Sequence, residues 1–117
     1  MNKEVNMSDV VVGNNSLQFK SAASAYGIFV PFIGLDSSKT YRFTVNPTVA
    51  GFRVYLVNYD STGVYKDNAI IVDKATGLTT YDFTPTEGYQ QGFCFACLSA
   101  TKDTLGTFTD LSLVEVI

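Results

Sequence analysis

The two cysteines, Cys94 and Cys97, form a Cys-x-x-Cys motif, the first pattern in the sequence that could carry chemistry. A four-ligand zinc site needs further Cys or His ligands, and the chain has no other Cys and no His. In a strand, residues i and i+3 point to opposite faces and lie roughly 10 Å apart, beyond the ~7 Å limit for a disulfide. We therefore predict two buried, reduced thiols that pack as small hydrophobic side chains.

The carboxylates are the next candidates, but they are scattered along the chain and most lie in turn sequences, where Asp binds its own backbone. A glycosidase needs two carboxylates about 5–10 Å apart across a cleft, and the sequence singles out no such pair. Without His, the Ser–His–Asp and Cys–His catalytic arrangements are also excluded. We predict that the protein is not an enzyme and has no cofactor, with a structural calcium at Asp110 as the one metal site considered.

The segment Gly51–Tyr59 alternates, so one face of the expected strand is apolar while the other carries Tyr side chains and an Arg. Tyr rings beside an Arg can stack on sugar rings or anchor a protein interface, because Tyr is amphipathic and frequent at binding hot spots. An alternative is cross-strand aromatic packing on a solvent-facing sheet. The candidate platform for a glycan or a protein partner consists of Arg53, Tyr55, Tyr59 and Tyr89.

Composition limits the classes of partner. A chain of 117 residues predicts one domain, and 46% hydrophobic with 16% charged residues indicates a globular protein. A net charge of −3 without basic clusters argues against nucleic acid, whose phosphates are neutralised by Lys and Arg. The polar start, residues 1–7, has no apolar core of a signal peptide, and no apolar stretch is long enough to cross a bilayer. We expect no membrane partner and synthesis in a host cytoplasm.

Period-2 alternation and turn sequences dominate the chain and predict about nine short strands. The expected strands are Asp9–Val12, Ser16–Lys20, Gly27–Ile33, Thr40–Val45, Gly51–Tyr59, Ala69–Asp73, Thr79–Thr84, Gly92–Ser99 and Thr107–Ile117. Asn46-Pro47 is expected to end the fourth of them. Such spacing is typical of an all-β antiparallel sandwich or barrel. We expect a single β-sandwich domain over residues 9–117 and a flexible N-terminal arm over residues 1–8.

One of these strands, Gly27–Ile33, is apolar on both faces. Pro31 cannot donate to a ladder, so the strand is expected at a sheet edge. An apolar edge strand must be covered to avoid aggregation, either by a loop of the same chain or by another subunit or partner. The candidate assembly surface is Phe29, Pro31 and Ile33.

Three short motifs follow in order: Lys39-Thr40-Tyr41 after an apolar strand and a polar turn, Asp82–Pro85, and a closing Asp-x-x-Leu at 110–113. This order resembles the jelly-roll carbohydrate-binding modules of glycosidases and the jelly-roll domains of bacteriophage virion proteins. The resemblance covers roughly residues 16–116 and implies a jelly-roll sandwich, with Asp110 in the place where the family often holds a structural calcium. The chain departs from it in having no Trp for stacking on sugars and no evident acidic N-terminal partner for Asp110.

Two functions are consistent with these features. The main expectation is a non-catalytic virion structural protein, a bacteriophage capsid decoration (auxiliary head) or tail accessory protein. It would act through protein–protein contacts as a homo-oligomer bound to capsid or tail proteins, over an interface on the order of 1,000 Å² or more. The alternative is a carbohydrate-binding module for glycan or host-surface attachment. The two share one fold, because such sandwiches host many functions.

Overall fold

The computed structural model describes residues 7–22, 27–32 and 34–117, and this part of the chain forms nine β-strands and one short 3₁₀ helix. In chain order they are β1 (Met7–Gly13), β2 (Ser16–Ser21), β3 (Gly27–Phe32), β4 (Tyr41–Pro47), β5 (Arg53–Tyr59), β6 (Tyr65–Asp73), β7 (Thr79–Phe83), β8 (Gln90–Ala96), η1 (Ser99–Thr101) and β9 (Leu105–Glu115). No helix in the described residues has the length and apolar character needed to span a membrane.

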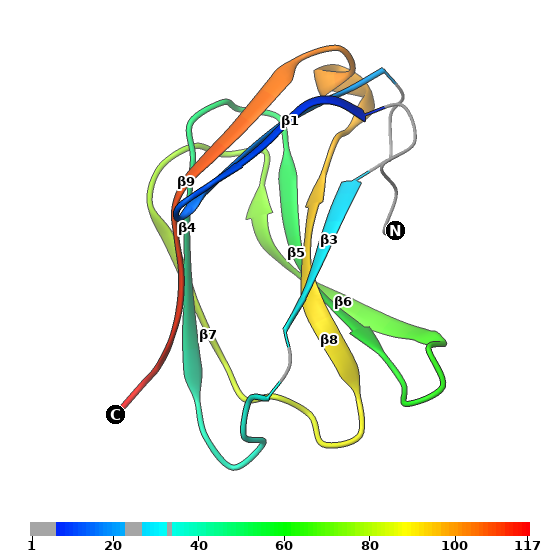
Figure 1. Cartoon of the computed structure of the whole chain (residues 1–117), viewed down its shortest axis with the longest axis vertical. Coiled ribbons are helices and arrows are strands. Elements are labelled where there is room, and N and C mark those ends of the chain that lie inside the picture. Colours follow the sequence, from blue (N-terminus) through cyan, green and yellow to red (C-terminus); the bar gives the residue numbers. More distant parts are fainter. Residues whose placement is uncertain (1–6, 23–26, 33) are drawn as a thin grey trace.

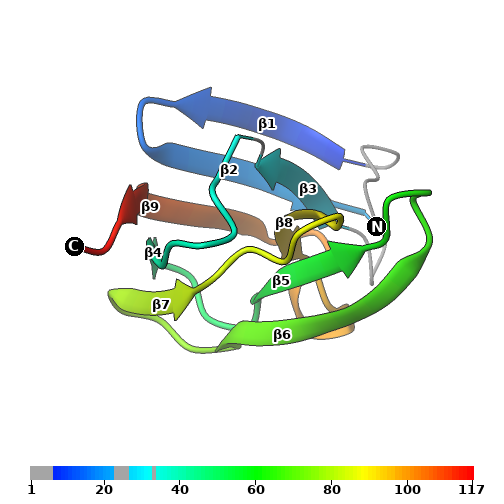
Figure 2. The same ribbon diagram turned by 90° about the horizontal axis from the view of Figure 1, so that it is seen from below.

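Two antiparallel sheets pack face to face (Figures 1 and 2). The larger has the strand order β1-β2-β9-β4-β7, and the smaller has the order β3-β8-β5-β6. The expected all-β antiparallel sandwich is therefore confirmed. The strand β3 lies at the edge of its sheet, as Pro31 predicts, and pairs only with β8 among the described strands.

Two boundaries differ from expectation. The strand β1 begins at Met7, inside the stretch assigned to an arm, while residues 1–6 lie outside the described residues. The prediction that Asn46-Pro47 ends the fourth strand is wrong, because β4 continues through both residues and Pro47 pairs with Phe108 of β9. Pairing of β4 with β7 has already ended at Val45, so the missing N–H of Pro47 costs no bond on that side.

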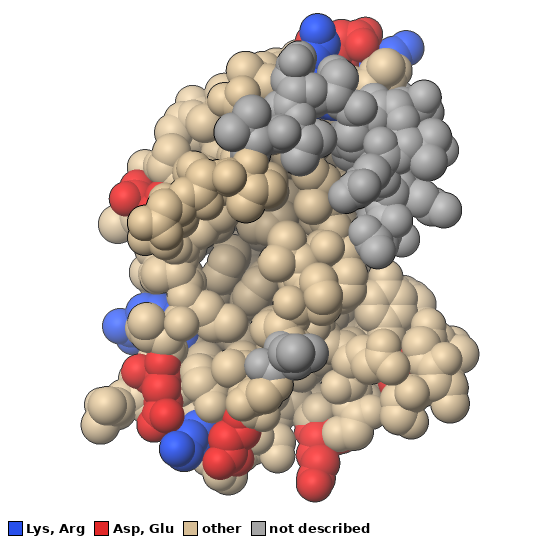
Figure 3. Space-filling view, in the orientation of Figure 1, with Lys and Arg blue, Asp and Glu red and all other residues tan. Residues whose placement is uncertain are grey.

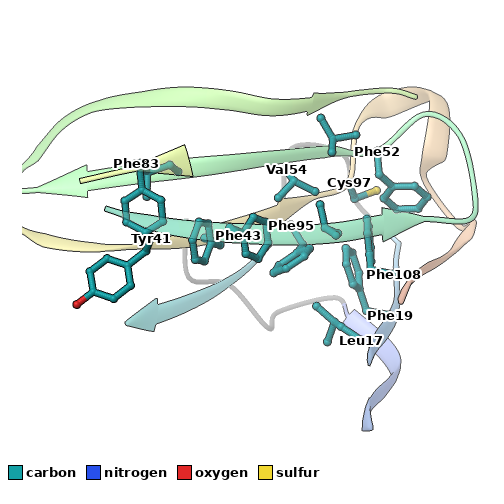
Figure 4. Close-up of a cluster of buried hydrophobic side chains, with 14 residues drawn as sticks. Leu17, Phe19, Tyr41, Phe43, Phe52, Val54, Phe83, Phe95, Cys97 and Phe108 are labelled. Carbon is teal, nitrogen blue, oxygen red and sulfur yellow. The ribbon is translucent and has the colours of Figure 1, made fainter. Parts of the chain in front are cut away.

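Aromatic side chains fill the space between the sheets (Figure 4). Phe19, Phe52 and Phe108 are almost completely buried. The Phe108 ring stacks on Phe19 at 5.9 Å between centroids and meets Phe52 edge-on at 5.7 Å. Because such rings bury a large apolar area and pair in defined geometries, this trio anchors the end of the core nearest η1.

A β-bulge at Asp110 lets apolar side chains on both sides of it in β9 face the core. Asp110 has φ 55°, in the left-handed region, and the β4–β9 register shifts by one residue beside it. The extra residue reverses the alternation, so that Leu111 and Leu113 pack against the core while Ser112 points outward. The Leu111 N–H then donates to the Asn15 carbonyl of the β1–β2 turn at 3.0 Å.

We expect Asp110→Ala to destabilise the protein more than Asp110→Gly does. Both substitutions remove the carboxylate, but only glycine adopts a left-handed conformation without a Cβ clash. The difference in the free energy of unfolding should be about 1 kcal/mol, measured by urea denaturation. Equal destabilisation by the two variants would contradict a backbone role for this position.

Candidate ligand-binding surface

The outer face of the smaller sheet carries a row of aromatic side chains. Phe29 on β3 pairs with Cys94 on β8, which in turn pairs with Tyr55 on β5, so these three side chains cross the sheet on one face. Gly92, two residues before Cys94, lies under the Phe29 ring: a Cβ added there would come within 2.7 Å of two ring carbons. The glycine thus makes room for the close approach of the aromatic ring.

The row continues toward β6 through edge-to-face ring contacts. Phe29 and Tyr59 meet at 5.5 Å with an angle of 81° between their planes, and Tyr59 meets Tyr65 at 6.1 Å and 76°. Tyr59 and Tyr55 are half-buried, and Tyr65 is 50% exposed. We call Phe29, Tyr55, Tyr59 and Tyr65 the aromatic surface. It presents ring edges and faces to solvent while being held by its own contacts.

Small buried side chains lie beneath the aromatic surface: Val57, Cys94 and Ala96. Burial raises the pKa of the Cys94 thiol to about 12, so it stays protonated at neutral pH. Cys97, on the opposite face of the strand, packs into the main core between the sheets. Both cysteines are free and buried, which confirms the prediction of two packed thiols.

Arg53 lies on the same outer face, close to Tyr55. Its Nε–H donates to Asp73 Oδ1 at 2.8 Å, and Nη1 donates to the Tyr55 hydroxyl at 3.5 Å. The hydrogen bond with Arg53 lowers the pKa of Asp73, and the same bond raises that of Arg53. The Arg53 guanidinium is therefore already paired with a carboxylate on this face.

Tyr89 stands at the end of the sandwich, in a pocket of about 630 Å³ between the β3–β4 and β7–β8 connections. Phe29, Pro31 and Gln90 also line this pocket, so it adjoins the aromatic surface. Its volume lies in the usual range for small-molecule sites. The pocket combines Tyr89 with polar side chains, which include Asp36, Glu87 and Gln90.

The turn that carries Tyr89 is held by the buried side chain of Gln91. Its Oε1 accepts a hydrogen bond from the Thr86 N–H at 2.8 Å, and its Nε2 donates to Asn58 Oδ1 at 2.6 Å. The Tyr89 N–H donates to the Thr86 carbonyl at 3.1 Å. Since a buried amide is costly to leave unpaired, this network fixes the turn, and with it the Tyr89 backbone, relative to β5.

The β5–β6 turn beside Tyr59 is organised by Asp60. Its Oδ1 accepts hydrogen bonds from the Thr62 hydroxyl at 2.6 Å, the Thr62 N–H at 2.9 Å and the Val64 N–H at 3.0 Å. These bonds lower the pKa of Asp60 below its ordinary value of 3.8. The Gln90 side chain donates to the Ser61 carbonyl at 3.2 Å, which ties this turn to β8.

This carboxylate makes the stability depend on pH. Because its pKa is lower in the folded state, the unfolded state binds the proton first, and the stabilisation is present above pH 3.8 and lost as the pH falls through the folded pKa. We expect Asp60→Asn to melt below the wild type at pH 7, with the difference shrinking below pH 3.8. Thermal melts from pH 7 to pH 2 test this, and a constant difference would contradict it.

The structure brings together most of the residues that the sequence suggested. Arg53, Tyr55 and Tyr59 share one face as expected, whereas Tyr89 lies in the adjoining pocket rather than beside the β5 side chains. Phe29, named in the candidate assembly surface, contacts Tyr59 and forms part of the aromatic surface. Ile33, named with it, lies outside the described residues.

Asp110, the candidate calcium ligand, lies on the larger sheet, away from the aromatic surface. Its Oδ2 accepts hydrogen bonds from Asn46 Nδ2 at 3.2 Å and from the Thr109 hydroxyl at 3.1 Å. Within the described residues, no group of three or more Cys, Asp or Glu side chains is placed to hold a metal ion. The observed role of Asp110 is the β-bulge described above.

Comparison with known proteins yields matches at the level of structure only. No family model and no curated protein matches the sequence. One solved structure, an arabinose-bound GH51 α-L-arabinofuranosidase, is 17% identical with a TM-score of 0.49, over 86% of this chain and 19% of that chain.

A second solved structure gives the stronger match. It contains the CBM22-1 and GH10 modules of Clostridium thermocellum endo-1,4-β-D-xylanase 10B, complexed with xylohexaose. It is 14% identical with a TM-score of 0.58, over 93% of this chain and 25% of that chain. This chain therefore spans about a quarter of the solved chain. The comparison confirms the fold: the protein is a β-sandwich similar to one in a glycosidase structure that carries a carbohydrate-binding module.

Proposed function

We propose that the protein is a non-catalytic carbohydrate-binding module that recognises a neutral oligosaccharide with its aromatic surface and the adjoining Tyr89 pocket. One observation carries the proposal: the edge-to-face pair of Phe29 and Tyr59 lies next to a pocket that offers Tyr89 and polar side chains. The surface therefore presents apolar ring faces and hydrogen-bonding groups within one continuous area.

A sugar ring needs this combination, because it has an apolar face of C–H groups and an edge of hydroxyls. Phe and Tyr rings cover the apolar face, while amide and hydroxyl groups such as those of Gln90 and Tyr89 can bond the edge. Arg53 is paired with Asp73, so its guanidinium is not free to attract a charged sugar. A neutral oligosaccharide fits this surface best.

The fold supports the same reading. The xylanase structure that this chain resembles contains a carbohydrate-binding module and was solved with a bound oligosaccharide, and its matched portion is the module-like part. Its sugar is not carried over to this chain. The likeness in fold favours this class of function, and the aromatic surface is the site that we propose for it.

A general-acid role for Asp36, which lines the pocket, is disfavoured by its hydrogen bonds. Asp36 Oδ1 accepts hydrogen bonds from the Ser38 hydroxyl at 2.7 Å and from the Ser38 N–H at 2.9 Å. These bonds lower the pKa of Asp36, whereas a glycosidase general acid needs a raised one.

A glycan array probed with the purified protein tests the proposal. We expect binding to neutral glycans that is lost at least tenfold in Tyr59→Ala and kept in Tyr59→Phe, because stacking needs the ring and not the hydroxyl. Val114→Ala, an exposed residue on the other sheet, is the matched control and should bind normally. Absence of binding to any glycan, or unchanged binding in Tyr59→Ala, would overturn the proposal.

A second candidate is assembly with protein subunits, as in the expected virion decoration. The observation in its favour is the edge strand β3, where Val30 and Pro31 are exposed. The structural comparisons are with glycosidase structures and do not support a role in a virus particle. Sedimentation of the purified protein tests this candidate: a homo-oligomer dispersed by Val30→Asp would favour it, and a monomer at high concentration would contradict it.

A further inference from the structure

A second pocket, separate from the aromatic surface, opens between the two sheets. Its volume is about 440 Å³, and Figure 3 shows the hollow left of centre on the face where the β1–β2 turn and β3 approach each other. Val30 and Phe32 on β3 form one wall, and Leu111 and Leu113 on β9 form the other. The pocket thus enters the sandwich from the side on which the β3 edge is unpaired.

The floor of the pocket belongs to the hydrophobic core. Leu17, Phe43, Phe93 and Phe95 line it, and each is at most 4% exposed. The site is therefore a recess into the interior rather than a flat apolar patch. A recess of this size and lining falls in the range of ligand sites, whose walls are predominantly apolar.

Polar groups occur only at the mouth. Among the described lining residues, the polar side chains are Asn15, Ser16 and Ser112, and none is charged. The mouth is also tied in place, because the Leu111 N–H donates to the Asn15 carbonyl at 3.0 Å and holds the β1–β2 turn against β9. An occupant with an apolar body and a small uncharged polar end matches this distribution, whereas a charged group would find no partner.

We propose that this inter-sheet pocket binds the unbranched alkyl chain of a small neutral amphiphile, with its hydroxyl at the mouth beside Asn15. The alkyl chain lies between Phe32 and Leu113 and reaches toward Phe93. Affinity then follows chain length, since each additional buried methylene strengthens binding about fourfold. This pocket shares no residue with the aromatic surface, although Pro31 and Phe32 line both this pocket and the Tyr89 pocket.

The test is titration of the protein with 1-hexanol, 1-heptanol and 1-octanol, followed by NMR of the valine and leucine methyl groups. We expect saturable binding of one molecule, an affinity that rises about fourfold with each carbon, and shifts of the Leu111 and Leu113 methyl signals. Val30→Trp, at the 44% exposed rim, should fill the mouth and weaken octanol at least tenfold. Val114→Trp, exposed on the outward face of β9, is the matched control and should bind as the wild type does.

Several outcomes would overturn the proposal. They are the absence of saturable binding, an affinity that does not depend on chain length, and equal binding by Val30→Trp and the wild type. A protein that self-associates through β3 and binds no octanol would also overturn it and would assign the pocket to a protein contact. Glycan binding by Val30→Trp reports separately on the aromatic surface.

Discussion

Replacing Phe108 by alanine is expected to lower the free energy of unfolding by about 3–5 kcal/mol, the usual cost of deleting a buried aromatic ring. The Phe108 side chain is fully buried and contacts the rings of Phe19, Phe52 and Phe95. Its neighbours cannot collapse into the space, because they come from both sheets and are held by their ladders. Urea denaturation followed by circular dichroism measures the loss.

Val114→Ala, on the same strand, provides the control for this substitution. Val114 is 55% exposed and should change stability by no more than about 0.5 kcal/mol. If Phe108→Ala cost no more than Val114→Ala, the sheets would not pack around this ring and the described core would be wrong. The denaturant slope should stay the same in both variants, since the surface exposed on unfolding is nearly unchanged.

Gly92→Val should both destabilise the protein and remove glycan binding. A Cβ at position 92 would lie 2.5 Å from the Val30 carbonyl oxygen and 2.7 Å from the Phe29 ring. Either the β3–β8 pairing opens or the Phe29 ring leaves its position beside Tyr59. We expect a loss of about 1–3 kcal/mol in the free energy of unfolding, typical of overpacking, and at least tenfold weaker glycan binding.

The control is Thr80→Val, an exposed position on β7 in the other sheet. It exchanges one β-branched side chain for another of similar shape at an exposed site, and should leave stability within about 0.5 kcal/mol and glycan binding unchanged. If Gly92→Val kept the affinity of the wild type, the position of the Phe29 ring would not matter for binding. That result would remove Phe29 from the site.

The alternation of polar and apolar side chains made most of the strands predictable. The start of β6 was missed because its first residues lack this alternation. In the expected strand Gly51–Tyr59, the inward Phe52, Val54 and Leu56 are all buried, as the alternation predicts. The strand β6 begins four residues before its expected start, because Tyr65, Lys66, Asp67 and Asn68 are all exposed and show no alternation. They are strand residues only because β5 pairs with them.

The candidate site was less predictable, because it depends on strand register. The sequence places Tyr55 and Tyr59 on one face, but Phe29 joins them only because β3 pairs with β8 in one register and β8 pairs with β5 in another. One local signal was present: Gly92 inside an apolar strand indicates the close approach of another group. The Tyr89 pocket depends on loop geometry, fixed by the buried Gln91, which a period-2 pattern does not contain.

The inter-sheet pocket illustrates the same limit. Leu111 and Leu113 line it only because the bulge at Asp110 reverses the alternation of β9. The family resemblance suggests a structural calcium at Asp110. Its left-handed conformation gives a backbone reason for the same residue.

The most direct test of the central claim, that the aromatic surface binds a glycan, is chemical-shift mapping. The protein labelled with nitrogen-15 is titrated with the best neutral glycan from the array. We predict that the largest shifts fall on the amides of Phe29, Tyr59, Tyr89 and Gly92. Shifts gathered instead on β1, β9 and β4, or no shifts at saturating glycan, would contradict the account.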